Sequence, residues 1–234
     1  MKPNLNFLTL IIISALILSC VNSCKKDEDK KDPVVNEETS INPCPGLPSI
    51  NYEGYTYLTI LIGNQCWLTE NLRYIPEVTP VDEWGSLVEP QYAVYDYTKQ
   101  DLFEVRTIEN FQTYGVLYNW PAALEACPDG WELPSKEDFE KLISELQGMG
   151  GSSFENITPD GKSGFDALMG GNRLADGSFS HLEEYGFWWT STPYPHILND
   201  VWYFRANNVN KNLLVNYIKK DLAYSVRCIK SQDK

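Results

Sequence analysis

An apolar segment near the N-terminus constrains this chain more than any other feature, because it decides the compartment in which the rest folds. Residues 7–18 are apolar except for Thr9 and Ser14, and the basic Lys2 precedes them. The segment is shorter than the roughly 20 residues that a membrane-spanning helix needs, and it has the layout of a secretory signal peptide. We therefore expect export into an oxidising compartment, where the cysteines of a folded domain can pair.

Two cysteines end this segment, and each is a candidate for lipid attachment. Residues 18–20 and 21–24 both resemble a lipobox, the motif whose cysteine becomes the acylated first residue of a bacterial lipoprotein. Cys24 is the preferred site, because the charged run at residues 25–29 resembles the export signal of Bacteroidetes surface lipoproteins, and Cys20 is the alternative. The expected localisation is the outer membrane or cell surface, with the lipid anchor as the contact to the membrane.

The rest of the chain divides at a change of composition near residue 48. After a signal peptide over residues 1–23, residues 24–48 are rich in charged residues, Pro and Asn. Such a segment buries too little apolar surface to offset the entropy of ordering, so we expect a lipid-anchored tether. Residues 49–234 are expected to form one globular domain, which is long enough for a single hydrophobic core.

The net charge argues against nucleic acid as a partner. The formal charge is -13 at pH 7 and no basic stripe interrupts the sequence, whereas phosphate binding needs a positive surface. Repulsion from anionic headgroups is expected to hold such an acidic domain off the membrane, so that the acyl chains alone attach it.

Hydrophobic periodicity predicts strands at both ends of the domain and helices between them. Residues 50–62 alternate in the manner of a strand and lead into a Gly63-Asn64 turn. Helices are expected at residues 120–126 and 136–147, the second opened by Ser135 in a capping box. Later aromatic or β-branched runs predict four more strands, at residues 187–190, 201–206, 213–218 and 224–229. Helices that are separated from strands along the chain indicate an α+β fold.

Beyond the two candidate lipidation sites, the chain contains an even number of cysteines, namely Cys44 in the tether and Cys66, Cys127 and Cys228 in the domain. In an oxidising compartment this predicts two disulfides, for which four cysteines allow three connectivities. A zinc site is disfavoured, because the domain has no Cys-x-x-Cys pair and its only histidines are His181 and His196. We expect neither a metal nor any other cofactor.

Several motifs, in collinear order, resemble the Fibrobacter succinogenes major paralogous domain. They read GNQCWLTENL, YGVLYNW, CPDGWELPS, GGNR, FWWTST and SVRC, and the resemblance runs from about residue 50 to residue 231. That family typically sits on secreted and lipid-anchored bacterial proteins and has no assigned biochemical activity. The resemblance therefore implies an envelope protein, in agreement with the N-terminal signal.

A more distant resemblance connects residues 120–139 and the cysteine in the last strand to C-type lectin-like domains. It implies a twisted antiparallel sheet flanked by two helices, with a disulfide between Cys127 and Cys228. Cys44 and Cys66 are then left to form the second bridge. The Glu-Pro-Asn and Gln-Pro-Asp tripeptides of the sugar-binding members are absent from the place of the long loop, so calcium-dependent sugar binding is not expected.

No pattern in the sequence predicts catalysis. Neither histidine lies in a recognisable triad context, and no glycine-rich phosphate loop occurs, so we expect no catalytic residues. The aromatic and amide residues after residue 186 resemble the composition of binding surfaces instead. The candidate ligand-binding residues are Trp189, Tyr194, Trp202, Arg205 and Asn207.

The leading functional hypothesis is a non-catalytic, adhesin-like binding module for a glycan or a protein. The alternative is a structural component of the envelope or of a surface assembly. An enzyme of unrecognised mechanism is the third hypothesis.

Overall fold

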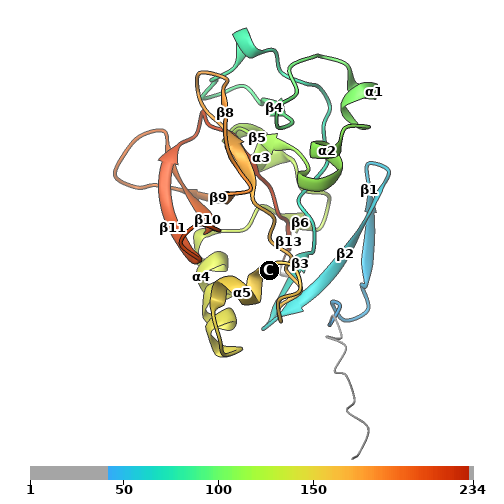
Figure 1. Ribbon diagram of the computed structural model, residues 1–234, viewed down its shortest axis with the longest axis vertical. Helices are drawn as coiled ribbons and strands as arrows, with labels where there is room; N and C mark the ends of the chain where they lie inside the picture. Colours follow the sequence, from blue (N-terminus) through green and yellow to red (C-terminus); the bar gives the residue numbers. More distant parts are fainter. Residues whose placement is uncertain (1–41, 232–234) are drawn as a thin grey trace, which may run out of the picture. The chain divides into compact units, whose positions relative to one another are not determined.

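The computed structural model describes residues 42–231, which fold into two curled β-sheets with short helices around them (Figure 1). The predicted signal peptide, both candidate lipidation sites, Cys20 and Cys24, and residues 24–41 of the predicted tether lie outside the described residues. None of the helices within residues 42–231 has the length and apolarity that crossing a membrane requires.

The first sheet is built mainly from the N-terminal part of the described chain. Within the described residues its strand order is β1-β2-β3-β13-β6, and each neighbouring pair is antiparallel. The predicted turn at Gly63 joins two of these strands, and the φ of +60° at Gly63 is the left-handed conformation that glycine adopts without strain. The strands are β1 (Ser49–Tyr52), β2 (Tyr55–Ile62), β3 (Gln65–Leu68), β6 (Trp131–Glu132) and β13 (Ile229–Lys230).

The second sheet has the order β11-β10-β9-β12-β5-β4; β7 joins it by pairing with β9, and β8 pairs with β7. Most of its pairs are antiparallel, but β9 pairs in parallel with β12 and with β7. The strands are β4 (Tyr92–Ala93), β5 (Leu117–Tyr118), β7 (Gly170–Arg173), β8 (Phe179–Leu182), β9 (Tyr185–Pro193), β10 (Asp200–Asn207), β11 (Asn212–Lys219) and β12 (Tyr224–Ser225).

The helices are short, and only α4 (Lys136–Gly148) runs beyond six residues. Its predicted capping box is present: the Ser135 hydroxyl accepts from the Asp138 backbone N–H, while the Asp138 carboxylate accepts from the Ser135 N–H. Its apolar stripe, which includes Phe139, is buried. The others are η1 (Val81–Glu83), α1 (Leu102–Val105), α2 (Glu109–Tyr114), α3 (Trp120–Glu125) and α5 (Ser153–Ile157).

The predicted α+β, C-type lectin-like architecture is wrong. The described chain is mostly β, with two curled sheets in place of one twisted sheet between two helices. The predicted strand at residues 224–229 is in fact divided between β12 of the second sheet and β13 of the first. The lectin resemblance covered α3, the start of α4 and the two cysteines of one disulfide. Such local features do not determine which strands pair across the molecule.

Strand β9 has a hydrophobic core on each of its two faces. Trp188 and Trp189 are adjacent, so their side chains point to opposite faces of the strand, and both are 0% exposed. Trp189 is one of the candidate ligand-binding residues, which are expected at a surface. Instead, Trp188 packs in a core with Phe139 of α4 and Phe204 of β10, whereas Trp189 packs in a separate core with tyrosines such as Tyr118. Both faces of β9 are therefore interior.

Two disulfides attach both ends of the described part of the chain to this framework, in the pairing that the lectin resemblance implied. Cys127, just after α3, is bonded to Cys228, just before β13, with 5.9 Å between their Cα atoms. Cys44 is bonded to Cys66 of β3, with a Cα separation of 5.6 Å. The second bridge attaches the start of the described chain to the first sheet.

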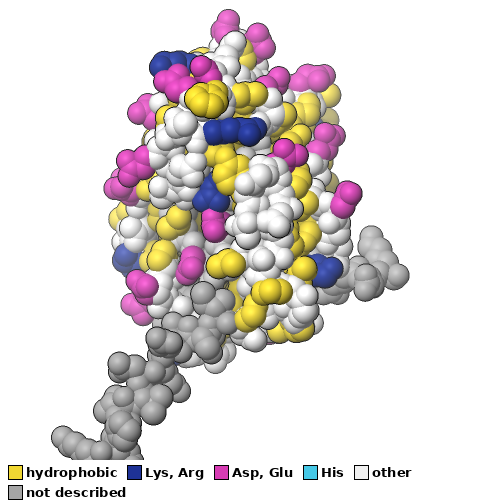
Figure 2. Space-filling model, turned by 90° about the vertical axis from the view of Figure 1, so that its right-hand side faces the viewer, with side chains coloured by type: hydrophobic (Ala, Val, Ile, Leu, Met, Phe, Trp, Pro, Cys, Tyr) yellow, Lys and Arg dark blue, Asp and Glu magenta, His cyan; other side chains and the backbone are white. Residues whose placement is uncertain are grey.

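Acidic and basic side chains are distributed differently on the face of the molecule that Figure 2 shows. Acidic side chains lie around much of its outline, and lysines and arginines are scattered singly among apolar groups. This face therefore has no continuous basic patch.

Candidate functional site

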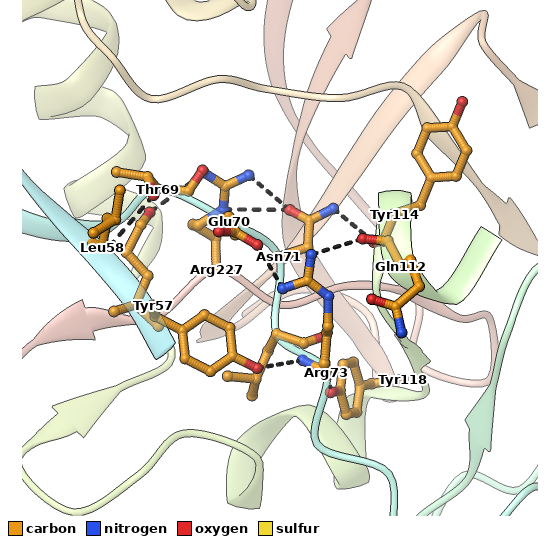
Figure 3. A network of polar contacts seen from close by, with 12 residues as sticks. Tyr57, Leu58, Thr69, Glu70, Asn71, Arg73, Gln112, Tyr114, Tyr118 and Arg227 are labelled. Atoms are coloured by element: carbon orange, nitrogen blue, oxygen red, sulfur yellow. Dashed lines mark hydrogen bonds and ion pairs between the residues drawn. The ribbon is translucent and has the colours of Figure 1, made fainter. Parts of the chain in front are cut away.

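A network of buried polar side chains centres on Arg227, which is 1% exposed (Figure 3). Its guanidinium donates to the backbone oxygen of Thr69 at 2.6 Å and to that of Phe165, and it lies 4.4 Å from the centroid of the Phe165 ring. Burial lowers its pKa to about 9. Among the described residues, no carboxylate lies within ion-pair distance of this cation. Neutral acceptors therefore hold it.

Asn71, which follows β3, is the second centre of the network. Its side-chain oxygen accepts hydrogen bonds from Arg227 Nη2 at 2.9 Å, from Arg227 Nε at 3.3 Å and from Trp188 Nε1 at 2.8 Å. Its side-chain nitrogen donates to the Tyr114 carbonyl at 3.0 Å and to Ser225 Oγ at 3.3 Å. One amide thus connects the first sheet, the second sheet and the end of α2.

This network has the properties of a scaffold. Its members are buried and their polar atoms are used in bonds to one another, so they present no reactive group to a ligand. At the edge of the network, Arg73 pairs with the more exposed Glu70 and also donates to the Gln112 carbonyl at 2.7 Å. A functional site is therefore expected at the surface.

Two of the five predicted ligand-binding residues are interior. Trp189 is 0% exposed, and its indole N–H donates to the Tyr118 carbonyl. Asn207 is 2% exposed, and its side-chain oxygen accepts from the backbone N–H groups of Val209 and Asn210. The first therefore belongs to the core, and the second closes the turn between β10 and β11.

Arg205 lies apart from the other candidates. It is half-buried, and its guanidinium is 5.4 Å from the centroid of the Tyr185 ring. Because side chains alternate along a strand, Arg205 and Trp202, three positions apart on β10, point to opposite faces of the sheet.

The remaining two candidates, Tyr194 and Trp202, meet in one cluster of aromatic side chains. We call Tyr194, Trp202 and Tyr217, together with Lys136, the aromatic face. The rings of Tyr194 and Tyr217 are stacked with centroids 3.7 Å apart, and Trp202 stands edge-on to them at 5.2 and 5.8 Å. The ammonium of Lys136, at the start of α4, is 5.1 Å from the Trp202 centroid. Each ring is held by the others and only half-buried, so the cluster is a rigid surface feature.

The segment between β9 and β10 extends this face with exposed apolar side chains. Leu198 is 89% exposed and Ile197 is 46% exposed. Backbone hydrogen bonds fix the segment, from Tyr194 N–H to the Asp200 carbonyl at 2.8 Å and from Asp200 N–H to the Ile197 carbonyl at 3.2 Å. Exposed apolar side chains that adjoin one another on an ordered surface are typical of interaction sites.

Sequence reasoning missed Tyr217 and Lys136. Tyr217 could have been found from the hairpin register, because a turn near residues 208–211 sets residue 202 opposite residue 217, as the structure has it. Lys136 carries no such local signal, since it reaches Trp202 only through the tertiary packing of α4 on the sheet. Within residues 42–231, no group of His, Cys, Asp and Glu side chains is arranged to hold a metal ion.

The family model described as Fibrobacter succinogenes major domain matches residues 60–230. No curated protein and no solved structure matches the chain.

Proposed function

This chain belongs to the Fibrobacter succinogenes major domain family, and on that premise we propose that it is a lipid-anchored, non-catalytic binding module of the cell surface. We further propose that it recognises a protein partner through the aromatic face.

The observation that carries this proposal is the combination of rigid rings with exposed aliphatic side chains. Tyr and Trp are the residues most enriched at the energetic centres of protein interfaces, because they bury a large area at little cost in conformational entropy. A protein partner would also remove Leu198 and Ile197 from water, whereas a hydrophilic glycan offers little apolar surface to cover them. These contacts favour a protein over a glycan as the ligand.

Cross-linking on intact cells tests the partner. A photoreactive amino acid in place of Leu198, in the full-length protein, is expected to yield a discrete protein adduct. The additional change Trp202→Ala is expected to reduce that adduct roughly tenfold or more, because truncating a central aromatic anchor costs at least about 1.4 kcal/mol of binding free energy. Tyr194→Ala, on the connecting segment, is a second variant that leaves the sheet intact.

The matched control places the same photoreactive residue at Phe103 of α1, which is 85% exposed and therefore as accessible as Leu198. Equal labelling from the two positions would show that the adduct reflects exposure alone. Binding to an array of glycans that depends on Trp202 would instead assign the aromatic face to carbohydrate.

The anchor is a separate part of the proposal. We expect the mature N-terminus to be acylated Cys24, because an apolar signal segment precedes it and a charged run follows it. The disulfide of Cys44 to Cys66 supports this role, since it fastens the chain to the domain 20 residues beyond the proposed lipid. Mass spectrometry of the protein from its native envelope should find the lipid on Cys24, and replacing Cys20 and Cys24 together should release the protein. Membrane retention after the double replacement would contradict lipid anchoring.

A further inference from the structure

A cavity of about 390 Å³ lies away from the aromatic face, between α5, the β10–β11 turn and the segment that leads into β7. Its apolar lining includes Phe154 and Met169, which are 4% and 8% exposed, and the ring of Tyr114. The volume falls in the range of small-molecule sites, which are concave and mostly apolar with a few polar groups at defined positions.

The aromatic lining depends on a glycine at the start of β7. A Cβ added to Gly170 would lie 3.2 Å from the Tyr114 Cβ, so the absence of a side chain there allows Tyr114 to pack directly over the strand. The interior wall is therefore shaped by the backbone as well as by side chains.

At one side of the cavity, the Lys211 side chain places a cation over the Phe154 ring. The ammonium of Lys211 is 5.0 Å from the centroid of Phe154, a distance at which a cation is attracted to the face of a ring. Lys211 also donates to Asn208 Oδ1 at 2.6 Å, and the Asn208 amide donates to the Glu183 carbonyl at 3.0 Å. The β10–β11 turn is thus fastened to the segment that carries Glu183.

Two carboxylates lie on the rim, those of Glu155 and Glu183. Neither is in an ion pair with another described residue. The pKa of the Tyr114 hydroxyl is raised, mainly by burial and to a smaller extent by the negative charge of Glu183. The charge of Glu183 is therefore close enough to act on the ring that lines the cavity. With one lysine against two acids, the rim attracts cations.

We propose that this cavity binds an organic ammonium ion with an apolar body about the size of a phenyl ring. The body packs against Phe154 and Met169, and the ammonium group takes the place of the Lys211 side chain, near the rim carboxylates. Lys211 acts as an internal competitor that occupies the cation position until a ligand displaces it. This inference is independent of the partner-binding role of the aromatic face.

Three probes that differ only in their head group test the proposal on the full chain: phenethylammonium, phenethyl alcohol and 3-phenylpropionate. Ligand-observed NMR and calorimetry should find the ammonium bound at least roughly tenfold more tightly than the other two. Glu183→Gln should weaken the ammonium severalfold, because it removes one rim charge and keeps the side-chain shape. Glu155→Gln provides the same test at the other rim carboxylate.

Lys211→Gln separates this proposal from an anion site in the same cavity. If Lys211 competes with the ligand, its neutral replacement tightens phenethylammonium binding. If Lys211 instead recognises a carboxylate, the replacement weakens 3-phenylpropionate. Glu184→Gln, an exposed neighbour outside the lining, is the matched control and should leave all three affinities unchanged.

Equal affinity for the three probes, an unchanged or weaker ammonium affinity in Lys211→Gln, or no binding of any probe would each overturn the proposal. Circular dichroism and thermal unfolding of each variant establish that it is folded before its affinity is compared.

Discussion

Removal of the Cys127–Cys228 disulfide, by Cys127→Ala with Cys228→Ala, is expected to lower the free energy of unfolding by roughly 4 to 5 kcal/mol. The two cysteines are 101 positions apart. Closing a loop of about that length removes nearly 5 kcal/mol of chain entropy from the unfolded state, and measured losses in small secreted domains run from about 2 to 5 kcal/mol. Alanine is preferred to serine, because Cys228 is fully buried and a hydroxyl there would need a hydrogen-bond partner.

The other disulfide is the matched control. Cys44 and Cys66 are separated by 22 positions, for which the same entropy argument gives about 3 kcal/mol. Chemical denaturation of both double variants under identical oxidising conditions would measure the two losses. An equal or larger loss for the Cys44 and Cys66 pair would contradict the view that the long-range bridge is the main covalent support of the fold.

Asn71→Ala is expected to lower the free energy of unfolding by about 3 to 5 kcal/mol, although it removes only a few atoms. The Asn71 oxygen accepts from two guanidinium nitrogens of Arg227 and from the indole N–H of Trp188. Without it, a fully buried cation loses an acceptor that no described carboxylate replaces, and breaking such a buried charged contact typically costs this much.

A second variant tests the same argument in the opposite direction. Arg227→Met removes the charge together with its donors, so it should cost less than Asn71→Ala. The exposed Arg106 provides the control, and Arg106→Met should change the free energy of unfolding by no more than about 0.5 kcal/mol. If Asn71→Ala behaves like Arg106→Met, the buried network does not support the fold.

Tertiary structure changed the interpretation of the predicted binding residues. Trp189 and Tyr194 both belong to an aromatic stretch that suggested a binding surface, and their composition alone does not separate them. Trp189 is covered because β12 lies beside β9 and β5 lies beside β12, so that the Tyr224 ring packs against the indole and the Tyr118 carbonyl accepts its N–H. Tyr194 lies just beyond the end of β9, where the chain turns back at the surface.

What the sequence determined by itself was local or covalent. The capping box of α4, its buried stripe and the turn at Gly63 follow from hydrogen bonds and backbone preferences within a few residues, and four cysteines suffice for two disulfides. Only the tertiary structure decided four other features: the division into two sheets, the burial of both Trp188 and Trp189, the burial of the Arg227 guanidinium among neutral acceptors, and the approach of Lys136 to Trp202. Each depends on which distant segments pack together, and periodicity along one strand carries no information about its neighbours.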